Sequence, residues 1–372
     1  MTYLDYSATT PVDGEVIDTY SKVCKKYIGN PNSLHKLGVE SKELIDASTE
    51  QIKKVLNLKD MDVIYTSGSS ESNNTAIKGI CLKYSNRGKH IITTELEHSS
   101  IVAPLNYLSG LGYEIDFVEL DEDGVVDLED LKNKMRDDTI LVTIASVNSE
   151  VGVRQPIDEI AKIVSDYPKC FFHSDVTQSI GKEKIDLNVL DLASFSGQKF
   201  FGMKGVGCLL KKSNIVIEPL IHGGKSTTIY RSGTPATPLI ASISKALRLV
   251  YENYDNKNKK VEELHDYLIN KLEKLVTINS NSKCVKQIVN FSIDSNIKSE
   301  VMLHALEEDE VYISTQTACS VGDYSKAVYA VCRDKTRASH SMRVSICYKT
   351  TYEEIDTFIN SLKKNLERLR IK

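Results

Sequence analysis

Three polar segments follow predicted strands, and their residue types suit the binding of a charged group. Residues 66–74 (TSGSSESNN) begin a helix pattern, where free N–H groups and serine hydroxyls could hold a phosphate. Residues 173–178 (HSDVTQ) place Asp175 just beyond an apolar run, and residues 194–199 (SFSGQK) place Lys199 in a turn of small residues. Each segment has an ordinary alternative, because Ser, Asn and Asp commonly cap helices and most lysines lie at the surface.

Two further residues stand out by their surroundings. Cys319 lies in the polar segment 314–323, and an exposed thiol of this kind can become a reactive thiolate, although an incidental surface thiol is the simpler interpretation. Arg343 lies in a strand-like apolar run, where burial is costly unless a carboxylate pairs with it. That carboxylate belongs either to the protein or to a substrate.

The elements that must position these residues alternate along the chain. Apolar runs predict strands at residues 63–66, 90–94, 114–118, 139–145, 170–173, 192–195 and 207–210. Helical patterns lie among them, at residues 40–56, 72–84, 128–135 and 157–166. This alternation predicts an α/β fold with a mostly parallel sheet, in which ligands bind beyond the carboxyl ends of the strands.

The pattern changes near residue 240. One long polar helix pattern covers residues 240–274, shorter α/β segments follow, and a last helix pattern covers residues 352–369. We therefore predict a large α/β domain over residues 12–240 and a smaller α+β domain over residues 241–372. The first 11 residues are expected to pack near the smaller domain.

The composition of the 372-residue chain is that of an ordinary globular protein, with 41% hydrophobic and 26% charged residues. A net charge of -4 gives no support to nucleic acid as the main partner. No apolar stretch approaches the length of a membrane span, and the first residues do not resemble a signal peptide. The eight cysteines include no C-x-x-C pair, so we expect reduced thiols, no metal site and a cytoplasmic protein.

Taken together, the motifs resemble the cysteine desulfurases of the NifS/IscS type, members of the class V aminotransferase family. The resemblance runs in the family's order along almost the whole chain. It includes the segments 4–11 (LDYSATTP), 29–33 (GNPNS), 66–74, 97–98 (EH), 175–178, 196–199 (SGQK) and 231–234 (RSGT), together with Cys319 and Arg343. The resemblance implies the type I fold of pyridoxal-phosphate-dependent transferases, with a large, mostly parallel seven-stranded sheet domain and a smaller C-terminal domain.

The resemblance also assigns roles around pyridoxal 5'-phosphate. Lys199 would attach the cofactor and move protons, Asp175 would face the pyridine nitrogen, and His98 would stack on the ring. The phosphate and the ring substituents would be held by Ser69, Ser70, Ser149, Gln178, Ser196 and Gln198, and by Thr234 from a partner subunit of a homodimer.

The remaining roles concern the substrate, L-cysteine. Asn30 and Arg343 would bind it, with Arg343 on its carboxylate. Cys319 would take the sulfur as a persulfide, releasing L-alanine, and would then pass the sulfur to an acceptor protein. That acceptor would be an iron–sulfur scaffold or a tRNA-thiolation enzyme.

Four residues at three sites depart from the family pattern. Gln198 replaces the usual histidine before the lysine, Ser149 replaces an asparagine, and Gln316-Thr317 replace a Gly-Ser pair. Two alternatives therefore stay open: a selenocysteine lyase or other class V aminotransferase, and a catalytically impaired relative that acts as a binding partner. The covalent residues Lys199 and Cys319 favour the desulfurase.

Overall fold

A computed structural model describes residues 1–293, 296–315 and 324–370. Its largest element is a seven-stranded sheet with the strand order β2-β8-β7-β6-β5-β3-β4. The strands are β2 (Met61–Thr66), β3 (His90–Thr93), β4 (Glu114–Phe117), β5 (Thr139–Thr143), β6 (Phe171–Asp175), β7 (Leu192–Ser196) and β8 (Gly207–Lys212). Only β8 runs antiparallel to its neighbours in this sheet, so the predicted mostly parallel seven-stranded sheet is confirmed.

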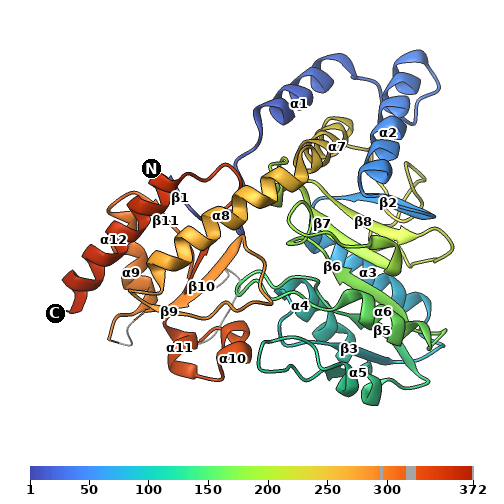
Figure 1. Cartoon of the computed structure of the whole chain (residues 1–372). Helices are drawn as coiled ribbons and strands as arrows, with labels where there is room; N and C mark the ends of the chain where they lie inside the picture. The colour runs from blue at the N-terminus through green and yellow to red at the C-terminus, as the bar shows by residue number, and fades with distance from the viewer. Residues whose placement is uncertain (294–295, 316–323, 371–372) are drawn as a thin grey trace.

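The five inner strands are buried along almost their whole length, without alternation, because helices cover both faces of the sheet. Adjacent residues such as Phe171 and Phe172 therefore enter different cores. One face is covered by α3 (Ser69–Lys83) and α4 (Ser99–Ser109). The other packs against α1 (Gly14–Lys26), α2 (Lys36–Val55), α5 (Leu128–Lys134), α6 (Ile157–Ser165) and α7 (Thr237–Tyr251). Figure 1 shows this layered unit beside a second, smaller one.

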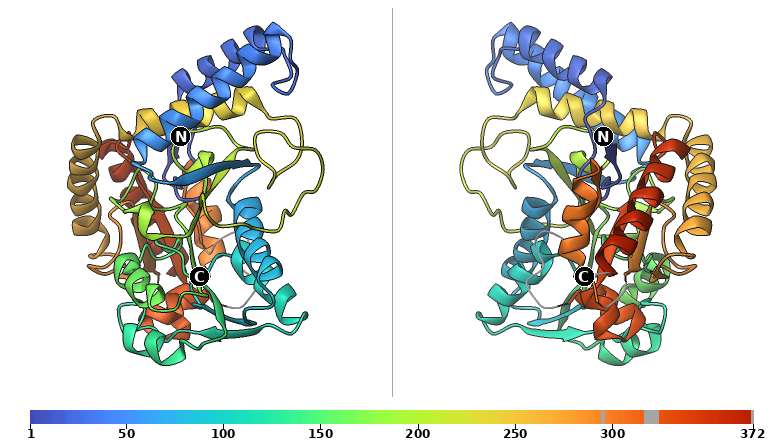
Figure 2. Two further views of the ribbon diagram at one scale, coloured as in Figure 1. Left: turned by 90° about the vertical axis from the view of Figure 1, so that its right-hand side faces the viewer. Right: turned by 90° about the vertical axis from the view of Figure 1, so that its left-hand side faces the viewer.

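The smaller unit contains a three-stranded antiparallel sheet with the order β12-β10-β9. Its strands are β9 (Thr277–Ile278), β10 (Ile288–Ser292) and β12 (Ser341–Ser345). The helices α8 (Tyr254–Leu272), α9 (Ser299–Glu307) and α12 (Tyr352–Arg370) supply much of its core, and the short helices α10 (Lys326–Cys332) and α11 (Lys335–Ser339) lie nearby. The two side views in Figure 2 show these helices against the second sheet.

The N-terminal segment belongs to the second core. The strand β1 (Thr2–Tyr3) pairs in parallel with β11 (Val311–Tyr312), and Leu4 is buried among the residues of the smaller unit. The following residues cross to the large unit, where Thr10 bonds to the backbone of Gln198. The segment thus bridges both units.

The predicted long helix over residues 240–274 is wrong in one respect, because it is divided into α7 and α8. The break lies at Glu252 and Asn253, and Asn253 takes a left-handed conformation that ends the helical path. Four buried α7 residues belong to the core of the large sheet, and three partly buried ones pack against it. The domain division stays a prediction, and this packing leads us to place it between α7 and α8 rather than at residue 240.

None of the helices in the described part of the chain combines the length and hydrophobicity of a membrane span.

Candidate active site

A cavity of about 310 Å³ lies at the carboxyl ends of the large sheet's strands, against the N-terminal segment and the smaller unit. Loops after β2, β3, β5, β6 and β7 supply one wall, and β12 supplies the opposite one. Seven of the predicted site residues line it, namely Ser69, His98, Ser149, Asp175, Gln178, Lys199 and Arg343. The fold therefore brings together residues that are far apart in the sequence.

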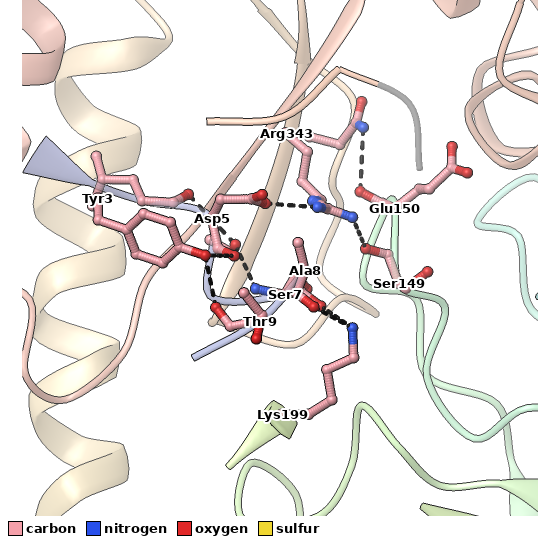
Figure 3. A network of polar contacts seen from close by, with 12 residues as sticks. Tyr3, Asp5, Ser7, Ala8, Thr9, Ser149, Glu150, Lys199 and Arg343 are labelled. Atoms are coloured by element: carbon pink, nitrogen blue, oxygen red, sulfur yellow. Dashed lines mark hydrogen bonds and ion pairs between the residues drawn. The ribbon is translucent and has the colours of Figure 1, made fainter. Parts of the chain in front are cut away.

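Lys199 ends a single 3₁₀ turn, Gly197–Lys199, that follows β7. Its Nζ donates to the backbone carbonyls of Ser7 at 2.9 Å and Ala8 at 2.6 Å. Figure 3 shows the lysine reaching up to these carbonyls from the large unit. The amine is thus held at the cavity wall by the N-terminal segment.

Asp175 is the last residue of β6, and both of its carboxylate oxygens accept hydrogen bonds. Oδ1 accepts from the backbone N–H of Thr177 at 2.9 Å, and Oδ2 accepts from Nδ2 of Asn73 at 2.8 Å. Two donors compensate the desolvation of a buried carboxylate. The carboxyl group is therefore held in place beside the cavity as a hydrogen-bond acceptor.

His98 caps the N-terminus of α4, and its ring lines the cavity. Its Nδ1 lies 3.1 Å from the backbone nitrogen of Ser100 and 2.8 Å from the Ser100 Oγ. Because a backbone N–H can only donate, Nδ1 is an acceptor and the proton of the neutral ring lies on Nε2.

Arg343 on β12 is buried and paired with a carboxylate of the protein. Its Nη2 lies 2.7 Å from Oδ1 of Asp5, and its Nη1 donates to the carbonyl of Ser149 at 2.9 Å. Figure 3 shows Asp5 and Ser149 on two sides of the guanidinium. Of the two kinds of carboxylate partner expected from the sequence, the structure contains the protein's own, Asp5.

Gln178 follows β6 and lines the same cavity as Lys199. Its Nε2 donates to the Ser7 carbonyl at 3.0 Å, and its Oε1 accepts from Nζ of Lys182. Burial, with the positive charges of Lys199 and Arg343, lowers the pKa of Lys182 to about 7. The Lys182 contact fixes which end of the amide is the donor.

The N-terminus of α3 forms the other end of the site. Its N-cap residue, Gly68, has no side chain that could accept from the first N–H groups, which have no intrahelical partner in any helix. The backbone N–H of Ser69 lies 3.3 Å from the Oγ of Ser196, and a side chain at Gly68 would meet that hydroxyl at 3.2 Å. Glycine therefore keeps the approach to these donors open.

The remaining predicted residues do not line the cavity of a single chain. Asn30, Ser70 and Thr234 are exposed, and Gln198 contributes its backbone carbonyl to Thr10. Cys319 and the pair Gln316-Thr317 lie outside the described residues. Among the described residues, no group of His, Cys, Asp and Glu side chains is arranged to hold a metal ion.

Asn73 and Asp5 are functional residues of the site that had no predicted role. Both stand inside the motifs that carry the family resemblance, so their positions were visible. Their partners Asp175 and Arg343 lie 102 and 338 residues away, and no local pattern indicates such contacts.

Comparison with known proteins agrees with this geometry. The family model "Aminotransferase class-V" matches residues 2–358. The cysteine desulfurase IscS of Dictyoglomus turgidum is 37% identical, over 99% of this chain and 95% of the relative. The "NifS/IcsS protein homolog" of Lactobacillus delbrueckii subsp. bulgaricus is also 37% identical, over 96% and 95% of the two chains.

Solved structures extend the agreement to the whole fold. A "NIFS-like protein" is 31% identical with a TM-score of 0.92, covering 99% of this chain and all of the other. "SspA in complex with cysteine" is 26% identical with a TM-score of 0.83, covering 94% of this chain. The chain belongs to the class V aminotransferase family and, within it, to the cysteine desulfurases of the IscS/NifS type.

Proposed function

We propose that this protein is a pyridoxal-phosphate-dependent cysteine desulfurase that forms a persulfide on Cys319. One observation carries the proposal: a single cavity is lined by the amine of Lys199, the carboxylate of Asp175, the imidazole of His98 and the guanidinium of Arg343. This set combines an attachment point, an anion, a ring and a carboxylate receptor. Membership of the cysteine desulfurase family indicates which of these roles each group has.

The residues present fit pyridoxal 5'-phosphate. The uncapped N-terminus of α3, with the hydroxyls of Ser69, Ser70 and Ser196, offers donors for a phosphate dianion. Asp175 offers an acceptor for a protonated pyridine nitrogen, and Gln178 offers Nε2 to a ring oxygen. When bound, the cofactor supplies an electron sink for reactions at the substrate's α-carbon.

The chain's own groups divide the remaining work. The Lys199 amine, once released from the carbonyls of Ser7 and Ala8, attaches the cofactor and carries protons. His98 lines the cavity and carries its ring proton on Nε2. Arg343 receives the substrate carboxylate, for which it is pre-oriented by Asp5 and by the carbonyl of Ser149.

Sulfur transfer is assigned to Cys319. The chain reaches the cavity wall at Ser314, five residues before this cysteine, and Ser314 is paired through its backbone with Arg343. The Cys319 thiolate attacks the substrate sulfur, so that an S–S bond forms and the substrate's C–S bond breaks. The electron pair left on the substrate carbon takes up a proton, and L-alanine leaves.

A homodimer would complete the site with Asn30 and Thr234 of a second chain. The loops that carry these residues expose large apolar side chains, with exposed fractions of 97% for Leu34, 73% for Ile28 and 56% for Ile229. Burial of such a surface favours association. We place the protein in the cytoplasm and expect the persulfide sulfur to pass to a protein of iron–sulfur assembly or tRNA thiolation.

The test uses purified protein, pyridoxal phosphate and L-cysteine. We expect visible absorbance in the wild type but not in Lys199→Ala, and alanine and sulfide in the presence of a thiol reductant. Cys319→Ser should form neither persulfide nor sulfide, whereas Cys24→Ser, at an exposed cysteine of α1, should match the wild type. Full activity of Cys319→Ser would contradict the assignment, and preference for selenocysteine would favour the lyase.

A further inference from the structure

Asn73 lies at the centre of a buried hydrogen-bond chain that joins two walls of the cavity. It sits in the first turns of α3, with an exposed fraction of 0%. Its Nδ2 lies 2.8 Å from Oδ2 of Asp175 and 2.9 Å from Oγ of Ser100. Ser100 in turn contacts Nδ1 of His98 at 2.8 Å.

The hydrogen bonds that join Asp175, Asn73, Ser100 and His98 have only one consistent assignment of donors and acceptors. An amide nitrogen carries two hydrogens, and Asn73 gives one to Asp175 and the other to Ser100. The Ser100 hydroxyl, already accepting from Asn73, has its own hydrogen left to give to Nδ1 of His98. Turning the amide over would place its oxygen against the Asp175 carboxylate, which is repulsive.

We propose that Asn73 is a positioning residue, which holds the Asp175 carboxylate in place and orients the Ser100 hydroxyl as a second donor to Nδ1 of His98, beside the Ser100 backbone N–H. The side chain acts through its two N–H donors, because its buried Oδ1 has no hydrogen-bond partner. The consequence for the cofactor rests on the proposed function. The link from Asn73 to His98 does not depend on the proposed function, because it involves only side chains of the protein and no cofactor.

The chain contains a matched control for the loss of a buried asparagine. Asn365 in α12 is also 0% exposed, its Nδ2 also donates inside a helix-lined core, and its Oδ1 is likewise without a partner. It belongs to the smaller unit and does not line the cavity. Asn73→Ala and Asn365→Ala should therefore both lower the melting temperature, while only Asn73→Ala should change the site.

Two measurements test the proposal. The first is the dissociation constant for pyridoxal phosphate, which Asn73→Ala should raise about ten- to a hundredfold by removing a hydrogen bond to a charged group. Asn365→Ala and Ser100→Ala should stay within about threefold of the wild type, because both keep the contact between Asn73 and Asp175. If Asn73→Ala does not fold, Asn73→Leu keeps about the side chain's size and removes the donor without adding a charge, with the same expected loss.

The second measurement is NMR of ¹⁵N-labelled histidine in the cofactor-free protein, with His98 assigned from a His98→Gln variant. At about pH 8.5, where an ordinary histidine is neutral, the wild type should show a proton on Nε2 only. Asn73→Ala and Ser100→Ala should shift the Nδ1 signal of His98, because they disturb or remove the hydroxyl contact, while the Ser100 backbone N–H keeps the proton on Nε2; Asn365→Ala should change neither signal. A proton on Nδ1 in the wild type, or unchanged cofactor affinity in Asn73→Ala, would overturn the proposal. A wild type that binds no cofactor would refute the proposed function but leave the histidine test valid.

Discussion

Asp5, just after the first strand β1, and Arg343, on the last strand β12, form an ion pair of 2.7 Å across 338 residues of sequence. Arg343 is only 2% exposed, so Asp5 supplies the negative charge that makes its burial tolerable. The same pair fixes the guanidinium at the cavity wall. A substrate carboxylate that reaches Arg343 therefore meets an arginine already oriented by the N-terminal segment.

Asp5→Asn should destabilise the fold, because it leaves the buried charge of Arg343 without its anion. We expect the free energy of unfolding to fall by about 3 kcal/mol in chemical denaturation. Asp13→Asn is the matched control, since Asp13 pairs with Lys349 at 2.8 Å near the surface and asparagine still caps α1. Its expected loss is below about 1 kcal/mol, and equal losses in both variants would contradict the role of Asp5.

Glu97 should make the protein less stable as the pH rises. Burial raises the pKa of its carboxyl from 4.5 to about 8, against hydrogen bonds from Ala145 and Thr94. The folded state thus holds a proton that the unfolded state has released, so stability falls between pH 4.5 and about 8 and then levels off.

The measurement is the free energy of unfolding against pH for the wild type and Glu97→Gln. Across this pH range the free energy of unfolding of the variant should fall by roughly 2 to 4 kcal/mol less than that of the wild type. Glu95→Gln, at an exposed position two residues earlier, should follow the wild-type curve. Parallel curves for the wild type and Glu97→Gln would show that Glu97 titrates normally.

Lys182 should act in the opposite direction at higher pH. The pKa of its amine is lowered to about 7, so above that value the unfolded state binds a proton that the folded state does not. Stability should therefore rise from about pH 7 toward the ordinary lysine value of 10.5. Lys182→Met should remove this rise in denaturation experiments, whereas Lys184→Met, at a largely exposed lysine, should retain it.

Leu34→Asp should weaken the proposed homodimer. The substitution puts a charge in place of the most exposed large apolar side chain among the described residues, which lies in the loop between α1 and α2. We expect the dimer dissociation constant, measured by sedimentation, to rise at least about thirtyfold. Val301→Asp on α9 is the control, since Val301 is 46% exposed on the smaller unit. A wild type that sediments as a monomer would refute the dimer.

Much of the large sheet was predictable from the sequence, because a strand covered on both faces is apolar along its whole length. Phe171 and Phe172 illustrate this, since each enters a different core. Lys199 and Asp175 could be singled out because a polar residue just after such a strand lies at the edge where parallel strands bind ligands. Their joint appearance in one cavity follows from the strand order.

The sequence by itself determined the positions of the large sheet's seven strands, the helix that starts at the serine-rich segment and the family to which the chain belongs. Only the tertiary structure decided which carboxylate meets Arg343, which amide holds Asp175 and where the helix over residues 240–274 divides. The physical reason is the range of the interactions. The pattern of apolar residues that predicts a strand or helix extends over a few neighbouring residues. A hydrogen bond between residues hundreds of positions apart depends instead on how separate elements pack.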